Sequence, residues 1–204
     1  MPPALPTTLA FATTNRGKLA EVAAILRLDG VRVVAADALV PGWCVVEDGA
    51  TFAENARIKA RDLARRSATP ALGEDSGLEV AALGGRPGIH SARYAGEGTS
   101  YAAKVTRLLA ELHGVPEHER GAAFHCAVAL AWPDGAIVVA AGRCEGSIAL
   151  APRGTGGFGY DPVFVDPATG LTFAELPVEE KNARSHRRRA LEALWSVLAG
   201  GVRP

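Results

Sequence analysis

The residues best suited to chemistry are the adjacent carboxylates Glu74 and Asp75, which follow a short apolar segment and precede Ser76 and Gly77. On an extended backbone, neighbouring side chains point to opposite faces. Both carboxylates can therefore face one site only if the backbone turns, and Ser-Gly is suited to a turn. Asp75 is our candidate for work with a divalent metal, because metals of this kind prefer oxygen ligands. The alternative is an ordinary solvated Asp-Ser-Gly turn.

A polar turn at residues 14–18 joins a short apolar segment to the helix predicted next in the chain. Asn15 is suited to cap that helix, and Lys18 lies in its first turn. Free backbone N–H groups and the helix dipole favour an anion such as phosphate at this place. The pattern of a P-loop is absent. The alternative interpretation is a capped surface helix with a solvated Lys18.

Three further segments carry charged or aromatic residues that a ligand requires. Glu47 is an acidic loop residue that could reach a metal, and Lys59 lies on a predicted helix. The glycine-rich segment 154–162 lets the backbone approach a ligand closely, and its Phe158 can stack on a base. No helix follows it, so it is not a dinucleotide-binding turn. A basic run at residues 186–189 opens the last helix, where cations oppose the dipole unless a polyanion lies opposite.

The hydrophobic pattern predicts strands between these polar segments. Short apolar runs are typical of buried strands, and longer alternating runs of half-buried ones. Pro133-Asp134-Gly135 is a strong hairpin signal between two long runs. The predicted strands are 9–13, 31–35, 121–132, 136–148, 162–165, and 171–176 as a further strand or a continuation.

Apolar residues at helical spacing predict the remaining elements. One helix follows the polar turn at 14–18, and another spans 53–67, with Asn55 and Lys59 on its more polar side. A third runs from a cap at Thr99 or Ser100 to about residue 113. The last helix opens with the polar run 179–189 and ends at Gly200-Gly201.

Composition limits the class of protein. At 204 residues, with 48% hydrophobic and 22% charged residues, the chain is expected to form a single domain, residues 1–204, without a linker. Lys plus Arg equals Asp plus Glu, at 22 each, which argues against a nucleic-acid partner. Cys44, Cys126 and Cys144 are expected to be small buried hydrophobes in a reducing compartment. Without a signal peptide or an apolar span, we expect a cytoplasmic protein with no membrane partner.

Together these features indicate a site for a nucleoside triphosphate. A Mg²⁺ ion held by carboxylates, several cations and a stacking aromatic ring are what such a ligand requires. The sequence here resembles the inosine triphosphate pyrophosphatase family, the Ham1/RdgB-like pyrophosphatases of non-standard purine nucleotides. The matching blocks, in the family's order, are residues 13–18, 51–56 with 59–60, 75–78, 85–94, 156–162, 180–181 and 185–187.

The resemblance implies the fold, the reaction and the assembly. It implies a two-lobed α/β fold around a long mixed β-sheet with flanking helices and a central active-site cleft, in a homodimer. The implied reaction is Mg²⁺-dependent hydrolysis of ITP, dITP and XTP to the monophosphate and pyrophosphate. The chain departs from many relatives at Val46, where they carry an acidic residue, and at Glu74, where they carry Asp.

The same resemblance implies roles for particular residues. Glu47 and Asp75 would hold the metal, and Asp75 would also accept the proton of the attacking water. Ser76 would contact the nucleotide. The triphosphate would be bound by Thr13, Thr14, Asn15, Arg16, Gly17, Lys18 and Lys59, and the purine by Phe158, Gly159, Tyr160, Asp161, Lys181, His186 and Arg187.

The residue types agree with this choice of purine. Lys181 and Arg187 only donate hydrogen bonds, so they suit a base with a keto group at C6. Adenine presents an amino donor there and would leave a buried cation unpaired. Two alternatives stay open: a pyrophosphatase for other modified nucleotides, such as methylated pyrimidine triphosphates, and a nucleotide- or RNA-binding module in which Asp75 is structural.

Overall fold

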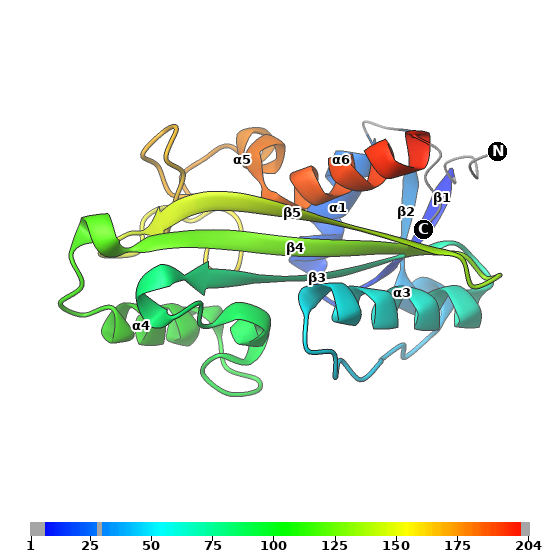
Figure 1. Ribbon diagram of the computed structural model, residues 1–204, viewed down its shortest axis with the longest axis horizontal. Coiled ribbons are helices and arrows are strands. Elements are labelled where there is room, and N and C mark those ends of the chain that lie inside the picture. The colour runs from blue at the N-terminus through cyan, green and yellow to red at the C-terminus, as the bar shows by residue number, and fades with distance from the viewer. Residues whose placement is uncertain (1–6, 28–29, 201–204) are drawn as a thin grey trace. The chain divides into compact units, whose positions relative to one another are not determined.

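The computed structural model describes residues 7–27 and 30–200. It contains a six-stranded sheet with the order β2-β1-β3-β4-β5-β6 and helices along its faces (Figure 1). β1 pairs in parallel with β2 and with β3, whereas β5 and β6 are antiparallel. The predicted α/β class, with a mixed sheet and flanking helices, is confirmed. The last helix ends at Ala199, directly before Gly200, as predicted. Residues 1–6 and Gly201 lie outside the described residues.

The strands and helices have the following bounds. The strands are β1 (Thr8–Ala12), β2 (Arg32–Ala35), β3 (Ala71–Val80), β4 (Gly121–Ala131), β5 (Ile137–Ile148) and β6 (Phe164–Val165). The helices are α1 (Arg16–Arg27), α2 (Ala36–Leu39), α3 (Phe52–Ser67), α4 (Tyr101–Glu111), α5 (Val178–Arg184) and α6 (His186–Ala199), and Ala81–Leu83, Gly88–Arg93 and Glu117–Glu119 form 3₁₀ turns. In the described part of the chain, no helix is long and apolar enough to cross a membrane.

The chain divides into two compact units. Unit 1 comprises Met1–Asp75, Cys126–Gly142 and His186–Pro204, and unit 2 comprises Ser76–His125 and Arg143–Ser185. The division passes through β3, β4 and β5, so each of these strands supplies residues to both units. Each unit has hydrophobic clusters of its own and is described separately.

In unit 1, alternation along the strands gives each face of the sheet its own helices. Leu9, Phe11 and Leu72 belong to a cluster with α1 and α6. The neighbouring small residues, such as Ala10 and Ala71, belong to a second cluster with α3 (Figure 1). Side chains one residue apart on β3 are therefore placed among different helices, because the side-chain period of a strand is two.

Gly73 allows α3 to lie close to β3. A Cβ atom at Gly73 would be only 2.1 Å from the carbonyl oxygen of Ala56 and 2.6 Å from the backbone nitrogen of Ala60. Because the packing here is close, a side chain at this position would push the backbone of α3 away from β3. The absence of a side chain at Gly73 thus fixes where the polar residues of α3 meet the strand.

Unit 2 is built around aromatic side chains. The rings of Phe124 and Phe164 have centroids 4.5 Å apart, and those of Phe164 and Phe173 are 4.9 Å apart. α4 packs on the same cluster through an apolar stripe that includes Val105 and Leu108. Stacked and edge-to-face pairs of this kind add to the burial of apolar area.

Local capping signals were predicted correctly. The side chain of Asn15 accepts a hydrogen bond from the N–H of Lys18 at 3.1 Å, and that of Ser100 accepts one from Ala103 at 3.3 Å. α3 begins with a reciprocal capping box between Thr51 and Glu54, which was not predicted. Each cap satisfies backbone donors that have no partner inside the helix.

Three predicted features are wrong. Residues 171–176 form turns with a single bridge, Val165 to Thr172, and no strand. The run predicted as one last helix is broken at Ser185, whose extended backbone separates α5 from α6. Cys44 is exposed, whereas Cys126 and Cys144 are buried as expected, and none of these three cysteines forms a disulfide. Local periodicity contains no information on such interruptions.

Candidate active site

β3 remains extended from Ala71 to Val80 and places Glu74 and Asp75 on opposite faces of the sheet. The turn predicted at Ser76-Gly77 is therefore wrong, because pairing within a sheet outweighs a local turn preference. The alternative of a solvated turn is wrong as well, since Glu74 is only 1% exposed and Asp75 only 8% exposed. The two neighbouring carboxylates consequently belong to two different groups of side chains.

Glu74 lies in a buried network with α1 and α6. One of its oxygens, Oε2, is 3.0 Å from Nζ of Lys18, and the other, Oε1, accepts a hydrogen bond from Nη2 of Arg187 at 3.2 Å. The Cys126 thiol also donates to Oε1, at 3.4 Å. Arg187 contacts a second carboxylate, Glu21, at 2.9 Å. Charges taken out of water in this way are tolerated when they are paired and hydrogen-bonded.

The network shifts the pKa values of Arg187 and Cys126. Burial alone would lower the pKa of Arg187, but Glu74 and Glu21 outweigh burial and raise that pKa. Burial raises the pKa of the Cys126 thiol well above its usual value, and the nearby Glu74 raises it further. Glu74 is thus committed to protein cations, and Cys126 remains a neutral hydrogen-bond donor.

Asp75 lies with α3 on the other face. The amide of Asn55 donates to Oδ2 of Asp75 at 3.1 Å, and Nζ of Lys59 is 3.6 Å from Oδ1. The Lys59 ammonium also donates to the carbonyl oxygen of Glu74 at 3.1 Å and forms an ion pair with Glu47. Asn55 and Lys59 are one helical turn apart, so both can reach the same carboxylate. We expected them on the polar side of the helix; instead both are buried, at 3% and 6% exposure.

The loop that carries Glu47 is held by the first turn of α3. The N–H of Gly49 donates to Oδ1 of Asn55 at 2.9 Å, and the N–H of Ala50 donates to Glu54 at 2.7 Å. Asn55 thus connects the loop with Asp75: its amide oxygen binds the loop, and its amide nitrogen binds the carboxylate. This arrangement places the Glu47 and Asp75 carboxylates around a single ammonium group, that of Lys59.

Burial raises the pKa of Asp75, although Lys59 and Lys18 oppose the shift. A carboxylate with a raised pKa is a stronger base than an exposed one, and perturbed groups of this kind gather at functional sites. Asp75 is therefore suited to accept a proton.

The donor set also fits a divalent ion of the magnesium type. Among residues 7–27 and 30–200, no group of three or more His, Cys, Asp or Glu side chains is placed to hold a metal. Mg²⁺, however, is usually bound through one or two carboxylates, with water and substrate oxygens completing its octahedron. Glu47 and Asp75 provide such a pair, and the Lys59 ammonium between them shows that a positive charge is favourable at that place.

The start of α1 presents polar groups beside Lys18. The N–H of Asn15 donates to Oγ1 of Thr13 at 3.1 Å, which together with the Asn15 cap fixes the turn. Thr14 and Arg16 are exposed there, and Gly17 is partly exposed. The side chain of Lys18 is only 17% exposed and its ammonium is paired with Glu74, so the alternative of a solvated lysine is wrong.

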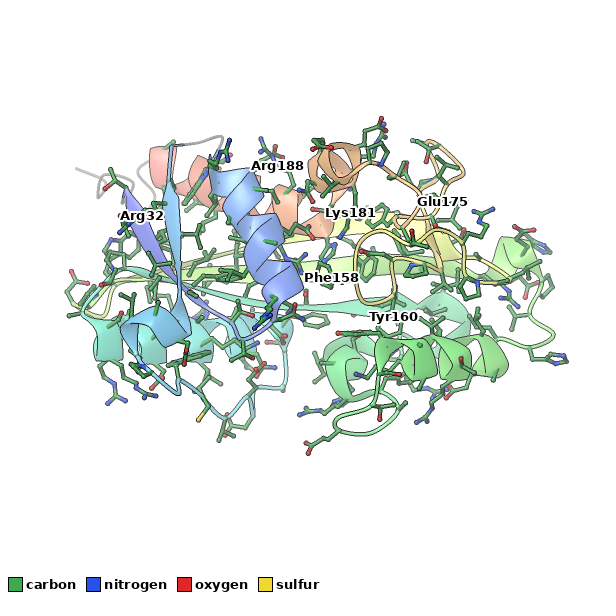
Figure 2. All side chains as sticks on the ribbon, turned by 180° about the vertical axis from the view of Figure 1, so that it is seen from behind. Arg32, Phe158, Tyr160, Glu175, Lys181 and Arg188 are labelled. Carbon is green, nitrogen blue, oxygen red and sulfur yellow. The ribbon has the colours of Figure 1, made fainter. Side chains whose placement is uncertain are left out.

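In unit 2, the glycine-rich segment forms a compact group with α5. Asp161 accepts a hydrogen bond from the N–H of Phe158 at 2.8 Å and pairs with Nζ of Lys181 at 2.8 Å. The Lys181 ammonium lies 4.5 Å from the centre of the Phe158 ring, and Figure 2 shows these side chains together. Gly157 makes this possible, because its φ of +67° suits glycine and a Cβ there would be 2.1 Å from the Asp161 carboxylate.

Tyr160 anchors the same segment to the unit 2 core. Its hydroxyl donates to the carbonyl oxygen of Ser91 at 2.9 Å, and burial raises its pKa. The side chain of Ser91 accepts a hydrogen bond from the N–H of Leu78, on β3, at 2.9 Å. The chain of contacts connects the segment to the strand that carries Ser76.

Two residues of this group were not predicted, Tyr101 and Lys104 on α4. The Tyr101 ring meets Tyr160 edge-on at 5.7 Å, and a side chain on Gly159 would touch it at 3.6 Å. Lys104 lies over the Tyr101 ring at 4.5 Å. A signal was available in the sequence: Lys104 occupies the helix face of Tyr101, Val105 and Leu108, where an apolar residue is expected.

The predicted site residues thus form two groups. Unit 1 holds Thr13 to Lys18, Glu47, Lys59 and Asp75, and unit 2 holds Ser76, Phe158 to Asp161 and Lys181. His186 and Arg187 were predicted with the purine but belong to unit 1, where both are buried and Arg187 contacts two carboxylates. Their contact with a purine stays a prediction.

Known proteins share both the sequence and the fold. The sequence model of the Ham1 family matches residues 9–197. A dITP/XTP pyrophosphatase of Geobacillus kaustophilus is 50% identical over 196 residues, which cover 95% of this chain and 96% of that protein.

Two solved structures extend the comparison. A HAM1 protein from Coxiella burnetii has a TM-score of 0.83 and 41% identity, covering 95% of this chain and 99% of that one. A nucleoside-triphosphatase, also named dITP/XTP pyrophosphatase, from Mycobacterium abscessus has a TM-score of 0.72 and 45% identity, covering 92% and 97%. A match of this extent, over nearly the whole of each chain, confirms the resemblance seen in the motifs: this protein belongs to the Ham1 family.

Proposed function

We propose that this protein is a Mg²⁺-dependent pyrophosphatase that hydrolyses ITP, dITP and XTP to the nucleoside monophosphate and pyrophosphate. The names of its relatives support the reaction and the substrates. The observation that carries the proposal is Asp75, a buried carboxylate with a raised pKa that shares the Lys59 ammonium with Glu47. Such an enzyme removes deaminated purines from the nucleotide pool.

Asp75 accepts the proton of the attacking water. Water forms a bond to phosphorus, the anhydride bond between the α- and β-phosphates breaks, and pyrophosphate leaves with the electron pair. Burial keeps Asp75 basic, and Asn55 fixes its orientation by donating to Oδ2. General base catalysis of this kind contributes about 10²- to 10⁴-fold to a rate. Glu47 and Asp75 would hold the metal ion, which neutralises phosphate charge when bound.

Backbone donors and cations of unit 1 bind the phosphates. The segment Thr13 to Lys18 presents the first N–H groups of α1, and the Lys18 ammonium adds a charge that Glu74 holds in place. Lys59 is placed to bind a phosphate oxygen, and Glu47, its present partner, would then be available to hold the metal ion. Because Glu74 is already paired with Lys18 and Arg187, it acts as a positioning residue and not as a metal ligand.

The aromatic group of unit 2 binds the purine. Phe158 stacks on the base, a contact that every base can make. Lys181, oriented by Asp161, donates to the keto group at C6. Adenine carries an amino donor at C6, so a buried ammonium would be left facing another donor, and ATP is rejected.

The test is an assay of the purified protein with ITP, dITP, XTP, dGTP and ATP, which measures pyrophosphate and orthophosphate separately. We expect pyrophosphate release from ITP, dITP and XTP in the presence of Mg²⁺ and none after chelation. Release of orthophosphate alone would overturn the mechanism. Turnover restricted to modified pyrimidine triphosphates would show that the substrates are these nucleotides and not non-standard purines. Tight binding without turnover would indicate a binding module.

We also propose a homodimer in the cytoplasm. Both proposals rest on the resemblance to the family and are tested by light scattering of the purified protein and by fractionation of the source cells. A monomer at the concentration used for the activity assay would contradict the first, and recovery in the secreted fraction the second.

A further inference from the structure

Lys104 is a buried cation for which the proposed mechanism has no use. The residue is 4% exposed and lies on α4. Its ammonium is 4.5 Å from the centre of the Tyr101 ring. In the part of the chain that the structure describes, the only contact found for this ammonium group is the one with the Tyr101 ring, and it has no hydrogen-bond acceptor or carboxylate partner.

Its surroundings make an uncompensated charge unfavourable. Lysine is almost never fully buried unless it is paired, because burial removes the water around its charge. The side chain also points back along α4 to Tyr101, in the first turn, since helical side chains tilt toward the N-terminus. The N-terminal end of a helix carries partial positive charge and favours anions. The contact with an aromatic ring offsets only part of these costs.

Lys181 provides a matched comparison within unit 2. Both ammonium groups lie 4.5 Å from the centre of an aromatic ring, Lys181 over Phe158 and Lys104 over Tyr101. Lys181 has Asp161 as a counterion at 2.8 Å, whereas residues 7–27 and 30–200 offer no counterion to the Lys104 ammonium. The two lysines therefore differ in one respect: the protein supplies an acceptor for one and leaves the other to be satisfied from outside.

The position of Tyr101 connects Lys104 with the segment that binds the base. A side chain on Gly159 would touch the Tyr101 ring, and that ring meets Tyr160 edge-on; Gly159 and Tyr160 directly follow Phe158. Lys181 thus lies over a ring of the segment 158–160, and Lys104 lies over a ring that packs against this segment. We expect a base stacked on Phe158 to turn its pyrimidine edge toward these two cations.

We propose that Lys104 determines specificity for xanthine by donating a hydrogen bond to its carbonyl group at C2. The inference rests on the proposed function and extends it. Xanthine and hypoxanthine share the C6 carbonyl, which Lys181 binds in the proposed function, and differ at C2, where hypoxanthine carries a hydrogen atom, and at the adjacent N3, which carries an acidic proton only in xanthine. A hydrogen bond from an ammonium is stronger than one between neutral groups. XTP gains this bond, whereas ITP leaves Lys104 as it is in the free protein.

The test compares XTP with ITP, which share the ribose and the triphosphate, in the wild type and in Lys104→Met. Methionine keeps the length and the contact with an aromatic ring while it removes the charge. We expect kcat/KM for XTP to fall about tenfold and that for ITP to stay within about twofold, as removal of one charge-assisted bond implies. Lys104→Arg should restore most of the XTP rate. Arg57→Met, on the exposed side of α3, removes one positive charge elsewhere and should leave the ratio unchanged.

A second measurement keeps the inference testable without turnover. Calorimetric titration with xanthosine and inosine monophosphates should show a selective loss of xanthosine monophosphate binding in Lys104→Met. Thermal unfolding should show this variant as stable as the wild type or more so, because an unpaired buried charge is removed.

The outcomes separate the two proposals. If Lys104→Met lowered kcat/KM equally for XTP and ITP, or for neither, the proposed hydrogen bond from Lys104 to the C2 carbonyl would be overturned. A wild type that hydrolyses neither nucleotide would overturn the proposed function, while binding of the two monophosphates would still decide about Lys104.

Discussion

Unit 1 and unit 2 stabilise buried cations by different means. In unit 1, Lys18 and Arg187 lie against Glu74, and Lys59 lies between Glu47 and Asp75. Every one of these cations has a carboxylate within contact. In the proposed reaction, a metal ion would replace a lysine as the partner of a carboxylate, and a triphosphate would replace a carboxylate as the partner of a lysine. Both exchanges are possible because positive and negative side chains alternate in this group.

In unit 2, two buried lysines lie on aromatic rings, whereas the buried Arg120 donates to backbone carbonyl oxygens. Lys181 is held over Phe158 and Lys104 over Tyr101, and of these two lysines Lys181 alone has a carboxylate partner among the described residues. An aromatic face attracts an ammonium group without using up its hydrogen-bond donors. The difference between the units teaches that carboxylate partners prepare a site for charge exchange, whereas aromatic partners leave donors available to read a base.

The largest effect is expected at Asp75. Asp75→Asn removes the proton acceptor and should lower kcat for ITP by about 10²- to 10⁴-fold, as loss of a general base does. Pyrophosphate release is the measurement. Titration with inosine monophosphate is the control and should show retained binding. A variant with more than about a tenth of wild-type kcat would mean that the base is another group.

Substitution of the neighbouring carboxylate, Glu74, should lower the stability of the fold. Glu74→Gln leaves Lys18 and Arg187 facing a neutral amide, and removal of one partner of a buried ion pair costs about 3–5 kcal/mol. Urea unfolding measures this loss, with Asp75→Asn as the matched control. If both variants unfold at the same urea concentration, the network around Glu74 does not stabilise unit 1.

The two lysines of unit 2 should differ in the same assay. Lys181→Met strands the buried Asp161 carboxylate and should lower the free energy of unfolding by about 3 kcal/mol. Lys104→Met strands no carboxylate and should not lower it. Equal destabilisation by the two substitutions would show that Lys104 has a counterion in solution.

A smaller effect is expected from the stacking ring. Phe158→Ala should raise KM for ITP by about 5- to 100-fold, which corresponds to about 1–3 kcal/mol for one base on one ring. The value of kcat should change much less, because the base lies away from the reacting phosphorus. Phe158→Tyr keeps the ring and serves as the control; an equal rise in KM in that variant would exclude stacking as the cause.

The smallest effect concerns alkaline pH. Burial, with help from Glu111, raises the pKa of Tyr94 to about 12, above the value of about 10 in an unfolded chain. Because the folded state disfavours the phenolate, this contribution to stability is intact below about pH 10 and is lost as the pH rises through the folded pKa. Tyr94→Phe should therefore lose less stability than the wild type between these values in urea unfolding. Identical slopes would contradict the shift.

The sequence by itself determined the features that depend on neighbouring residues. The polar side chains of Asn15, and of Thr99 or Ser100, identified two helix starts, and the structure shows caps at Asn15 and Ser100. The motifs identified the family, because their order along the chain does not depend on the fold. Each of these inferences uses spacing within a few residues, or the order of blocks.

Only the tertiary structure decided which partners those residues have. It kept β3 extended through Ser76 and Gly77, since a strand paired within a sheet gains more than a local turn offers. It turned Lys59 from a predicted polar face into a buried contact with Asp75. It also brought Arg187 to Glu74, which is 113 residues away in the sequence. Contacts over such separations are fixed by the packing of whole elements, and no local pattern records them.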